Sequence, residues 1–445
     1  MSPSSQSFRV AIVGGGLCGL TCAIPLIKAG VDVQVYEGAH KFAEIGAGVC
    51  LGQNAINILT KLGIYNDVYN NTLKPEPEDD MGPSSAPHQP VPPRGLDNMN
   101  GWFKYVAGEG DNEELCDYAA KDNVAQGVHR AVFLETLIAH VDPARTHFHK
   151  RCTHLTEGPS GTTIHFADGT SAEADVVLGA DGIKSAVRRF VAGTAGAPVD
   201  PHLKHSGSVA YRALVPAAVA AAAGCAVDYG ARPLCVVGKD KHFIIFTVRG
   251  GTMINIAAFV TDPARATPAT WVAPPAAGGE DVAPAVVLKA YEEWGPEMTR
   301  LLSCVTAAKK WDINVVHPPL APSAWTRGAV AILGDAAHGM QPHLGAGAGQ
   351  GLEDAYLLGR LLAHAQTSRA NVSDVLKVYA AVRQPRAHRV WEGSRRAGDI
   401  YEFRAGETID VAELRRLSGY VWDHAVDADV EAAEAMLVRE GVFAA

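Results

Sequence analysis

The chain has 445 residues, of which 47% are hydrophobic and 20% are charged. This composition is typical of a folded protein and excludes a disordered or fibrous chain, and the length predicts more than one domain. The net charge of −9 is spread along the chain without a basic stripe, which argues against a nucleic-acid partner. The eight cysteines are scattered without a metal-ligand spacing, so we expect a reduced, cytoplasmic protein with no bound metal.

The first segment, "FRVAIVGGGLCGLTCAIPLIKAGVDVQVYEG", predicts a strand, a glycine-rich turn, a helix and a second strand. Consecutive glycines and Pro25 interrupt its apolar run, so we expect neither a signal peptide nor a membrane anchor. Gly14, Gly16 and Gly19 form a dinucleotide fingerprint, and Glu37 is spaced to bond a ribose hydroxyl. A glutamate repels a 2′-phosphate, so the segment predicts an ordinary adenosine diphosphate moiety. The fingerprint does not distinguish NAD from FAD.

The composition and the hydrophobic pattern both change in the middle of the chain. Residues 74–95 are rich in proline and acidic residues, which predicts an exposed excursion. A helix is expected from Arg130, and "TIHFADGTSAEADVVLGADG" predicts a hairpin followed by a buried strand. Alternating apolar residues over 206–261 then predict antiparallel strands.

The last third is mostly helical in pattern. "AVVLKAYEEWGPEMTRLLSCV" predicts one amphipathic helix, and "AVAILGDAAH" a buried strand entering a second glycine-rich turn. Long helices are expected to about residue 400, with amphipathic helices beyond. The predicted fold is mixed α/β, with a Rossmann-like domain interrupted by a mostly antiparallel sheet domain and followed by C-terminal helices. The expected boundaries are 8–75, 105–200 and 305–385 for the Rossmann-like domain, 76–104 and 201–304 for the sheet domain, and 386–445 for the helices.

The stretch "GDAAHGMQPHLGAGAGQGLEDA" is rich in glycine. Because glycine loses much conformational freedom on folding, this density indicates that the backbone itself binds a ligand. Asp335 ends a strand, where it can bond the hydroxyls of a polyol chain. The N–H groups of residues 345–351 form a positive helix terminus that suits an electron-rich ring. A nucleotide site at one end of the chain and this turn near the other favour FAD, an extended molecule that spans both.

Three motifs in this order, "GGGLCGL", "ADGIKSAVR" and "GDAAHGMQPHLGAGAGQGLEDA", resemble the class A FAD-dependent aromatic hydroxylases, and among these the salicylate hydroxylases and their relatives. The similarity extends from about residue 8 to residue 400. It implies tightly bound FAD and transient NADH or NADPH, with NADH favoured. It also implies that O2 adds to the reduced flavin and that the resulting C4a-hydroperoxide attacks an activated aromatic ring.

The resemblance also implies roles for individual residues. Arg130 matches an arginine at the FAD phosphates, and Asp335 a residue on the ribityl chain. The "DG" motif, which consists of Asp181 and Gly182, matches together with Ser185 and Arg188 a segment that serves both FAD and the nicotinamide nucleotide. Pro342 matches a proline beside the reactive flavin edge. The residues matched to the FAD site are Gly14, Gly16, Gly19, Glu37, Gly48, Arg130, Asp181, Gly182, Asp335, Gly345, Gly347, Ala348 and Gly349.

Electrophilic attack requires an ionised phenol, so a base with a pKa near 7 is expected near the flavin edge. His343, next to Pro342, is the first candidate, although a histidine opening such a turn can equally bond a carbonyl. A substrate carboxylate requires a cation, for which Arg212, with its neighbour Tyr211, and Arg249 are candidates. Arg249 follows a strand at a hairpin turn, where it can equally be solvated.

The sequence contains two further candidate histidines, His338 and His242. His338 is expected to be structural, bonding the backbone around its turn, and His242 is a candidate for the pocket lining.

The expected function is conversion of salicylate to catechol with loss of carbon dioxide. Ring hydroxylation of another hydroxybenzoate, such as 3-hydroxybenzoate, or of a related phenol or pyridine, stays open. A flavin dehydrogenase without oxygen insertion, or an inactive binding protein, is less favoured because all motifs are intact. The partner is then a small aromatic acid, with no membrane involved. The C-terminal helices pack on the body or form a dimer contact, so a monomer and a homodimer are both allowed.

Overall fold

A computed structural model gives the architecture of the chain. It describes residues 8–42, 48–72, 103–118, 125–159, 161–248, 251–262, 264 and 279–445. Arg249 and the 74–95 excursion lie outside these residues.

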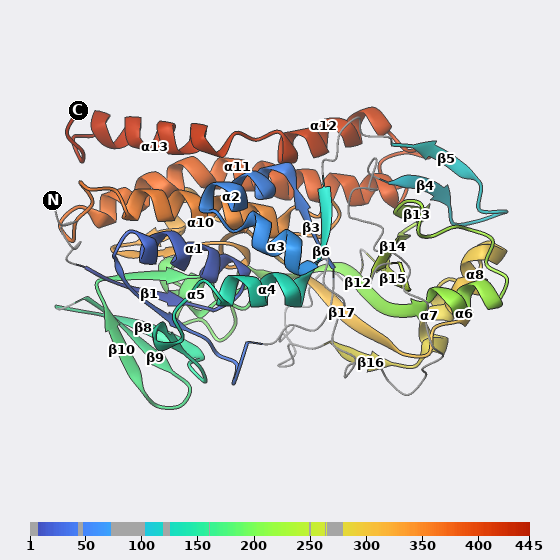
Figure 1. The fold of residues 1–445 in the computed structure, drawn as a ribbon, viewed down its shortest axis with the longest axis horizontal. Helices are drawn as coiled ribbons and strands as arrows, with labels where there is room; N and C mark the ends of the chain where they lie inside the picture. Colours follow the sequence, from blue (N-terminus) through green and yellow to red (C-terminus); the bar gives the residue numbers. More distant parts are fainter. Residues whose placement is uncertain are drawn as a thin grey trace.

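The first unit contains a six-stranded sheet with the order β18-β19-β11-β1-β2-β7 (Figure 1). The central strands β19, β11, β1 and β2 run parallel, so their carboxyl ends share one edge of the sheet. β1, β11 and β19 are short apolar runs, as is typical of parallel strands covered on both faces, whereas β2 alternates buried valines with polar residues. Their bounds are Arg9–Val13 (β1), Asp32–Tyr36 (β2), Thr146–His147 (β7), Val176–Gly179 (β11), Thr326–Arg327 (β18) and Val330–Ile332 (β19).

Helices cover this sheet and share its apolar core. The helix after β1, α1 (Leu17–Lys28), packs against α10 (Gly347–Leu362). Pro25 lies inside α1, and its ring faces Gly359 of α10, where a Cβ atom would lie 2.6 Å from Pro25 Cγ. The absence of a side chain at Gly359 therefore makes room for the ring of Pro25.

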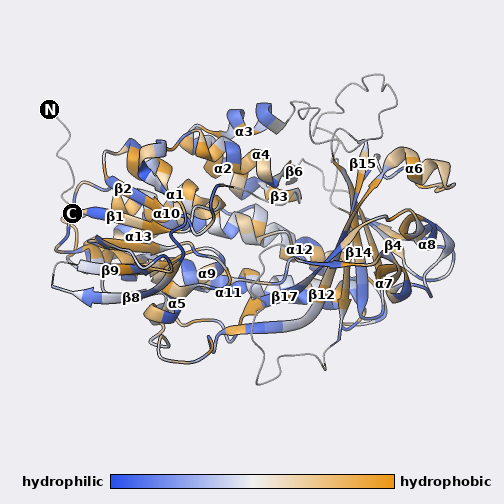
Figure 2. Cartoon of the chain, turned by 90° about the horizontal axis from the view of Figure 1, so that it is seen from below, coloured by the Kyte–Doolittle hydropathy of each residue, from blue (hydrophilic) through white to orange (hydrophobic). Residues whose placement is uncertain are grey.

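The second unit is an eight-stranded, mostly antiparallel sheet with the order β16-β17-β12-β15-β14-β13-β4-β5. One face packs on α6 (Ala217–Ala222), α7 (Pro284–Ala290) and α8 (Pro296–Ser303) through an apolar cluster (Figure 2). The opposite face, called here the inner face, packs on α11 (Val372–Tyr401) and on Leu344. The strands are Lys104–Ala107 (β4), Glu114–Asp117 (β5), Leu203–Pro216 (β12), Leu234–Gly238 (β13), Lys241–Val248 (β14), Met253–Thr261 (β15), Glu280–Val282 (β16) and Ala308–Val316 (β17).

The remaining elements connect these units. The long helix α11 runs from the parallel sheet to the antiparallel one, and α12 and α13 lie along it (Figure 1). No helix among the described residues is long and apolar enough to cross a membrane. The bounds are Gly48–Gly52 (β3), Gln53–Leu62 (α2), Tyr65–Thr72 (α3), Ala125–His129 (β6), Arg130–Ile138 (α4), Cys152–Gly158 (β8), Gly161–Phe166 (β9), Ser171–Ala174 (β10), Ala186–Val191 (α5), Asp335–His338 (α9), Val411–Trp422 (α12) and Val426–Arg439 (α13).

The mixed α/β class, the hairpin before β11 and the helix from Arg130 are confirmed. The single helix expected before residue 305 is wrong, because α7 ends at Ala290 and a separate helix, α8, begins at Pro296 after its N-cap Gly295. The boundaries of the two units also differ from the expected ones. Residues 104–117 and 308–316 belong to the eight-stranded sheet, since β4 pairs with β13 and β17 pairs with β12.

Candidate active site

The motif residues converge on one edge of the parallel sheet. Asp335 follows β19, Asp181 follows β11, Gly14 follows β1 and Glu37 follows β2, and these four strands are consecutive neighbours. In open α/β sheets, ligands bind outside the carboxyl ends of the strands. Segments that are far apart in the sequence thus meet at one edge of the sheet, which is called the crevice below.

The first glycine turn is shaped for close approach of a ligand. Gly14 has φ +107°, and a Cβ atom there would overlap with the carbonyl oxygen of Ala180. A Cβ atom at Gly16 would meet nothing within 4 Å, so the backbone is open on this side. The N-terminus of α1 has no side-chain cap and no acidic residue in its first turn. Its N–H groups are therefore available to an anion such as a pyrophosphate.

The carboxylate of Glu37 is held at the same turn. Its Oε2 accepts the N–H of Gly15 at 2.8 Å, and its Oε1 accepts the N–H of Ala39 at 2.7 Å. Each carboxylate oxygen has a second lone pair, so the group can still accept ribose hydroxyls.

The second glycine turn presents a single acid. Asp335 is exposed although its neighbours on both sides are buried, and a Cβ atom at Gly347 would lie 3.9 Å from its Oδ1. Helix α10 begins at Gly347 without a side-chain cap and without an acidic residue in its first turn. The turn thus offers a carboxylate for hydroxyls beside free N–H groups, as a flavin requires. Gly345 has φ +59°, and Ala348 and Gly349 continue the same turn.

The "DG" motif is tied to this second turn. The carboxylate of Asp181 accepts the N–H groups of Ala186 and Val187 at the start of α5, and burial raises its pKa. Arg188 is fully buried, pairs with Asp200 and donates to the carbonyl oxygen of Ala336 at 3.0 Å. Arg188 therefore joins the "DG" motif to the second glycine turn.

Two cationic side chains, Arg130 and Arg212, lie near each other between the two units. Arg130 begins α4 directly after β6, in which His129 pairs with Gly48. Burial and the charge of Arg130 both lower the pKa of Arg212, which lies on β12 of the other sheet. The Arg212 guanidinium lies over the ring of Trp311, 5.4 Å from its centroid. No acidic side chain of the described chain pairs with it.

Comparisons with known proteins agree with this geometry. The family model described as an FAD binding domain matches residues 7–394. The salicylate hydroxylase of Pseudomonas putida is 34% identical over 98% of this chain and 97% of its own. A 6-methylsalicylate 1-monooxygenase of Aspergillus terreus is 33% identical over 90% of this chain and 84% of its own. A solved salicylate hydroxylase substrate complex superposes with a TM-score of 0.79 at 30% identity, covering 97% of this chain and 98% of the other.

The chain belongs to the FAD-dependent aromatic monooxygenases of the salicylate hydroxylase type. Members of this family use bound FAD, a nicotinamide nucleotide and O2. The crevice described above has the uncapped helix ends and the exposed acid that this FAD needs.

Two of the expected catalytic residues of this monooxygenase, Tyr211 and His343, are packed away from the crevice. Successive residues of a strand point to opposite faces. Tyr211 packs with the apolar cluster under α7 and α8, whereas Arg212 points to the inner face. Pro342 is exposed, but His343 is only 4% exposed, and burial lowers its pKa to about 3. This imidazole does not match the expected base with a pKa near 7.

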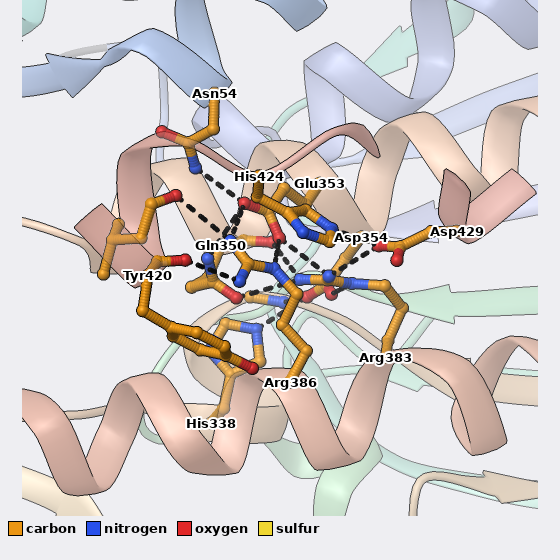
Figure 3. Close-up of polar contacts among 12 residues, drawn as sticks. Asn54, His338, Gln350, Glu353, Asp354, Arg383, Arg386, Tyr420, His424 and Asp429 are labelled. Atoms are coloured by element: carbon orange, nitrogen blue, oxygen red, sulfur yellow. Dashed lines mark hydrogen bonds and ion pairs between the residues drawn. The ribbon is translucent and has the colours of Figure 1, made fainter. Parts of the chain in front are cut away.

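A buried polar network lies behind the second glycine turn (Figure 3). Asp354 of α10 accepts the N–H of Gly334 at 2.9 Å, His338 Nε2 at 2.6 Å and Arg383 Nε at 2.8 Å. His338 is therefore structural, as expected, although it bonds a carboxylate and not the backbone. Glu353 accepts a hydrogen bond from Asn54 and pairs with Arg383 and Arg386. Arg386 also donates to the carbonyl oxygens of Tyr420 and Val421 at the end of α12.

This network supports the second glycine turn, and no sequence motif predicts it. Arg383 and Arg386 lie in "YAAVRQPRAHR", which has the charge density of an exposed helix. The packing of α10, α12 and α13 against α11 buries them.

Proposed function

We propose that this monooxygenase converts salicylate to catechol with loss of carbon dioxide, using NADH as the reductant. The observation that carries the proposal is the guanidinium of Arg212, which pairs with no acidic side chain among the described residues. An anionic substrate would supply the counter-ion that such a largely buried cation favours. A ring carboxylate fits a guanidinium with two parallel hydrogen bonds.

The inner face beside Arg212 suits an aromatic ring. Ala257 is paired with Arg212 in register, and Ile244 of β14 is paired with Ala257. A ring whose carboxylate binds Arg212 would thus lie on aliphatic side chains, with the cation Arg130 near the same end. This arrangement orients the ring and excludes water from it.

We assign the cofactor contacts by the geometry of the crevice. Glu37 would bind the ribose of FAD, Arg130 and the end of α1 its pyrophosphate, and Asp335 its ribityl chain. The N–H groups from Ala346 to Gly349 would face the pyrimidine side of the flavin, with Pro342 at its reactive edge. Gly345 would border the same side through its backbone, since its N–H donates to the carbonyl oxygen of Pro342 at 3.0 Å. Gly48, Asp181 and Gly182 would border the same crevice.

When bound and reduced, FAD supplies an electrophilic oxygen atom derived from O2. One atom of O2 forms a new bond to the carboxyl-bearing ring carbon, and the other leaves as water with two electrons from NADH. The bond from that carbon to the carboxylate breaks, and its electron pair restores the aromatic ring as carbon dioxide leaves. The protein orients and ionises the ring, while the cofactor performs the oxygen chemistry.

The second candidate is hydroxylation of another hydroxybenzoate without decarboxylation. It would use the same contact between a carboxylate and Arg212, so only the position of the ring differs. Salicylate, 3-hydroxybenzoate and phenol test both candidates, with NADH consumption and ring products measured together. Catechol from salicylate supports the proposal, and a dihydroxybenzoate from 3-hydroxybenzoate supports the alternative. Phenol as the best substrate would contradict the role of Arg212.

A further inference from the structure

The cation proposed for the ring carboxylate has an aromatic neighbour on the adjacent strand. Trp311 of β17 is paired in register with Ala210 of β12, which lies two residues before Arg212, so Trp311 and Arg212 share the inner face. The Arg212 guanidinium lies over the indole ring, 5.4 Å from its centroid. On the other side of Ala210, β15 places Phe259 in register. The guanidinium thus lies on the β17 side of the inner face, and the space beside β15 is left for a ring.

The indole ring is itself fixed by a close approach of the backbone. Gly279 precedes β16, whose first residue Glu280 pairs with Lys310, so Gly279 is opposite Trp311. A Cβ atom at Gly279 would lie 2.6 Å from Cε2 of Trp311, and the φ angle of Gly279 is +72°. A side chain at this position would therefore displace the indole.

The contact between Trp311 and Arg212 orients the guanidinium without using its hydrogen-bond donors. No acidic side chain among the described residues pairs with Arg212. An arginine side chain has many rotamers, and a fixed carboxylate partner normally selects one of them. Stacking on an indole involves the flat face of the guanidinium, whereas its N–H groups point outward in the plane. The indole can therefore select the orientation and leave the N–H groups to a ligand.

We propose that Trp311 is a positioning residue that orients Arg212 for a planar, doubly hydrogen-bonded carboxylate of the substrate. The inference rests on the proposed function, because it requires a ring acid whose carboxylate binds Arg212. Trp311 does not bind the carboxylate itself and acts through the guanidinium.

This orientation favours ionised ring acids over their neutral amides. A carboxylate accepts two parallel N–H bonds from a guanidinium that lies in its plane. A carboxamide offers only one acceptor, and its NH2 group presents donors to the second N–H of the guanidinium. Loss of the orienting indole should therefore weaken the binding of the acid and leave the binding of the amide nearly unchanged.

The test compares Trp311→Leu with Trp311→Phe in the full-length, FAD-loaded protein. Dissociation constants for salicylate and for salicylamide, its neutral carboxamide, are measured from the change in flavin absorbance on titration. Leucine removes the aromatic face, so we expect salicylate to bind about 3- to 30-fold more weakly, with salicylamide nearly unchanged. Phenylalanine keeps an aromatic face and should recover most of the affinity. In turnover, Trp311→Leu should raise KM for salicylate more than it lowers kcat.

A double-mutant cycle with Arg212→Met separates orientation from a general loss of packing. If Trp311 acts through Arg212, Trp311→Leu should not weaken salicylate binding further once Arg212 is replaced. Phe190→Leu is the matched control, because Phe190 of α5 also lies beneath a guanidinium, that of Arg327, at 4.6 Å, but in the parallel-sheet unit. This control should keep the wild-type affinity for salicylate.

Three results would overturn the positioning role of Trp311. These are wild-type affinity for salicylate in Trp311→Leu, equal weakening of salicylate and salicylamide, and additive effects of the changes at Trp311 and Arg212. A wild type that binds salicylate no more tightly than salicylamide, or that hydroxylates no ring acid, would overturn the proposed function instead.

Discussion

His338 Nε2 lies 2.6 Å from Oδ2 of Asp354, and the same oxygen accepts the N–H of Gly334. One buried carboxylate thus fixes both ends of the short turn that carries Asp335. Asp335 itself is exposed in the crevice. The two acids therefore have different roles, since Asp354 fixes the conformation of the turn and Asp335 is exposed to a ligand.

Asp335→Ala should lose flavin while leaving the fold intact. A hydrogen bond to a charged acceptor contributes about 1.5–3 kcal/mol, so we expect FAD to bind roughly 10- to 100-fold more weakly. The ratio of flavin to protein absorbance after purification and a titration of the apoprotein measure this. Because the side chain is exposed, the melting temperature of the apoprotein should stay close to the wild-type value. A fully yellow and active variant would show that Asp335 does not bind the cofactor.

Asp354→Asn should instead destabilise the protein. The change leaves Arg383 without one of its buried partners, and breaking a buried pair costs about 3–5 kcal/mol of unfolding free energy. Urea unfolding of the apoprotein measures it, with Asp374→Asn on the exposed face of α11 as the control. A loss below about 1 kcal/mol would mean that the network does not support the turn.

The same carboxylate predicts a pH dependence. Burial would raise the pKa of Asp354, but the charges of His338 and Arg383 lower it to about 2. The folded-state pKa is thus below the unfolded value of about 3.9. Its contribution to stability is complete above the unfolded pKa and is lost as the pH falls from about 4 toward 2. Unfolding free energies of wild type and Asp354→Asn should converge over this window, and a constant difference would contradict this origin.

Arg212→Met should raise KM for ring acids more than it lowers kcat. The expected rise is about 10- to 100-fold, because a charge-assisted pair is lost. Lys309→Met is the matched control, since Lys309 is opposite Arg212 in register but pairs with Asp281 near the surface. Steady-state kinetics at constant NADH and O2 measure both. An equal effect of the two changes would indicate general electrostatics and not a specific carboxylate contact.

Gly351→Ala tests the packing of α1 on α10. A Cβ atom at Gly351 would overlap with Cys18 Sγ, whereas its next neighbours lie 3.4 Å away. We expect a loss of about 1–3 kcal/mol from overpacking. Cys18→Ala should restore most of it in the double variant, as a double-mutant cycle measures. Additive losses would show that the two side chains do not meet.

The sequence predicts the crevice well because its parts are local. Gly14, Glu37, Asp181 and Asp335 each follow a recognisable apolar strand, and parallel pairing then brings these strand ends together. The pairing of β4 with β13 depends on residues more than a hundred positions apart, so the unit boundaries were not visible in the same way. Similarly, the burial of His343 depends on Gly398 of α11, where a Cβ atom would overlap with the imidazole.

The central claim, decarboxylating hydroxylation of salicylate, is tested most directly by stoichiometry. NADH consumption in air with salicylate should be measured together with catechol, carbon dioxide and hydrogen peroxide. We predict one catechol and one carbon dioxide for about each NADH consumed, with little peroxide. NADH consumed mainly to peroxide, or a dihydroxybenzoate formed without carbon dioxide, would contradict the claim.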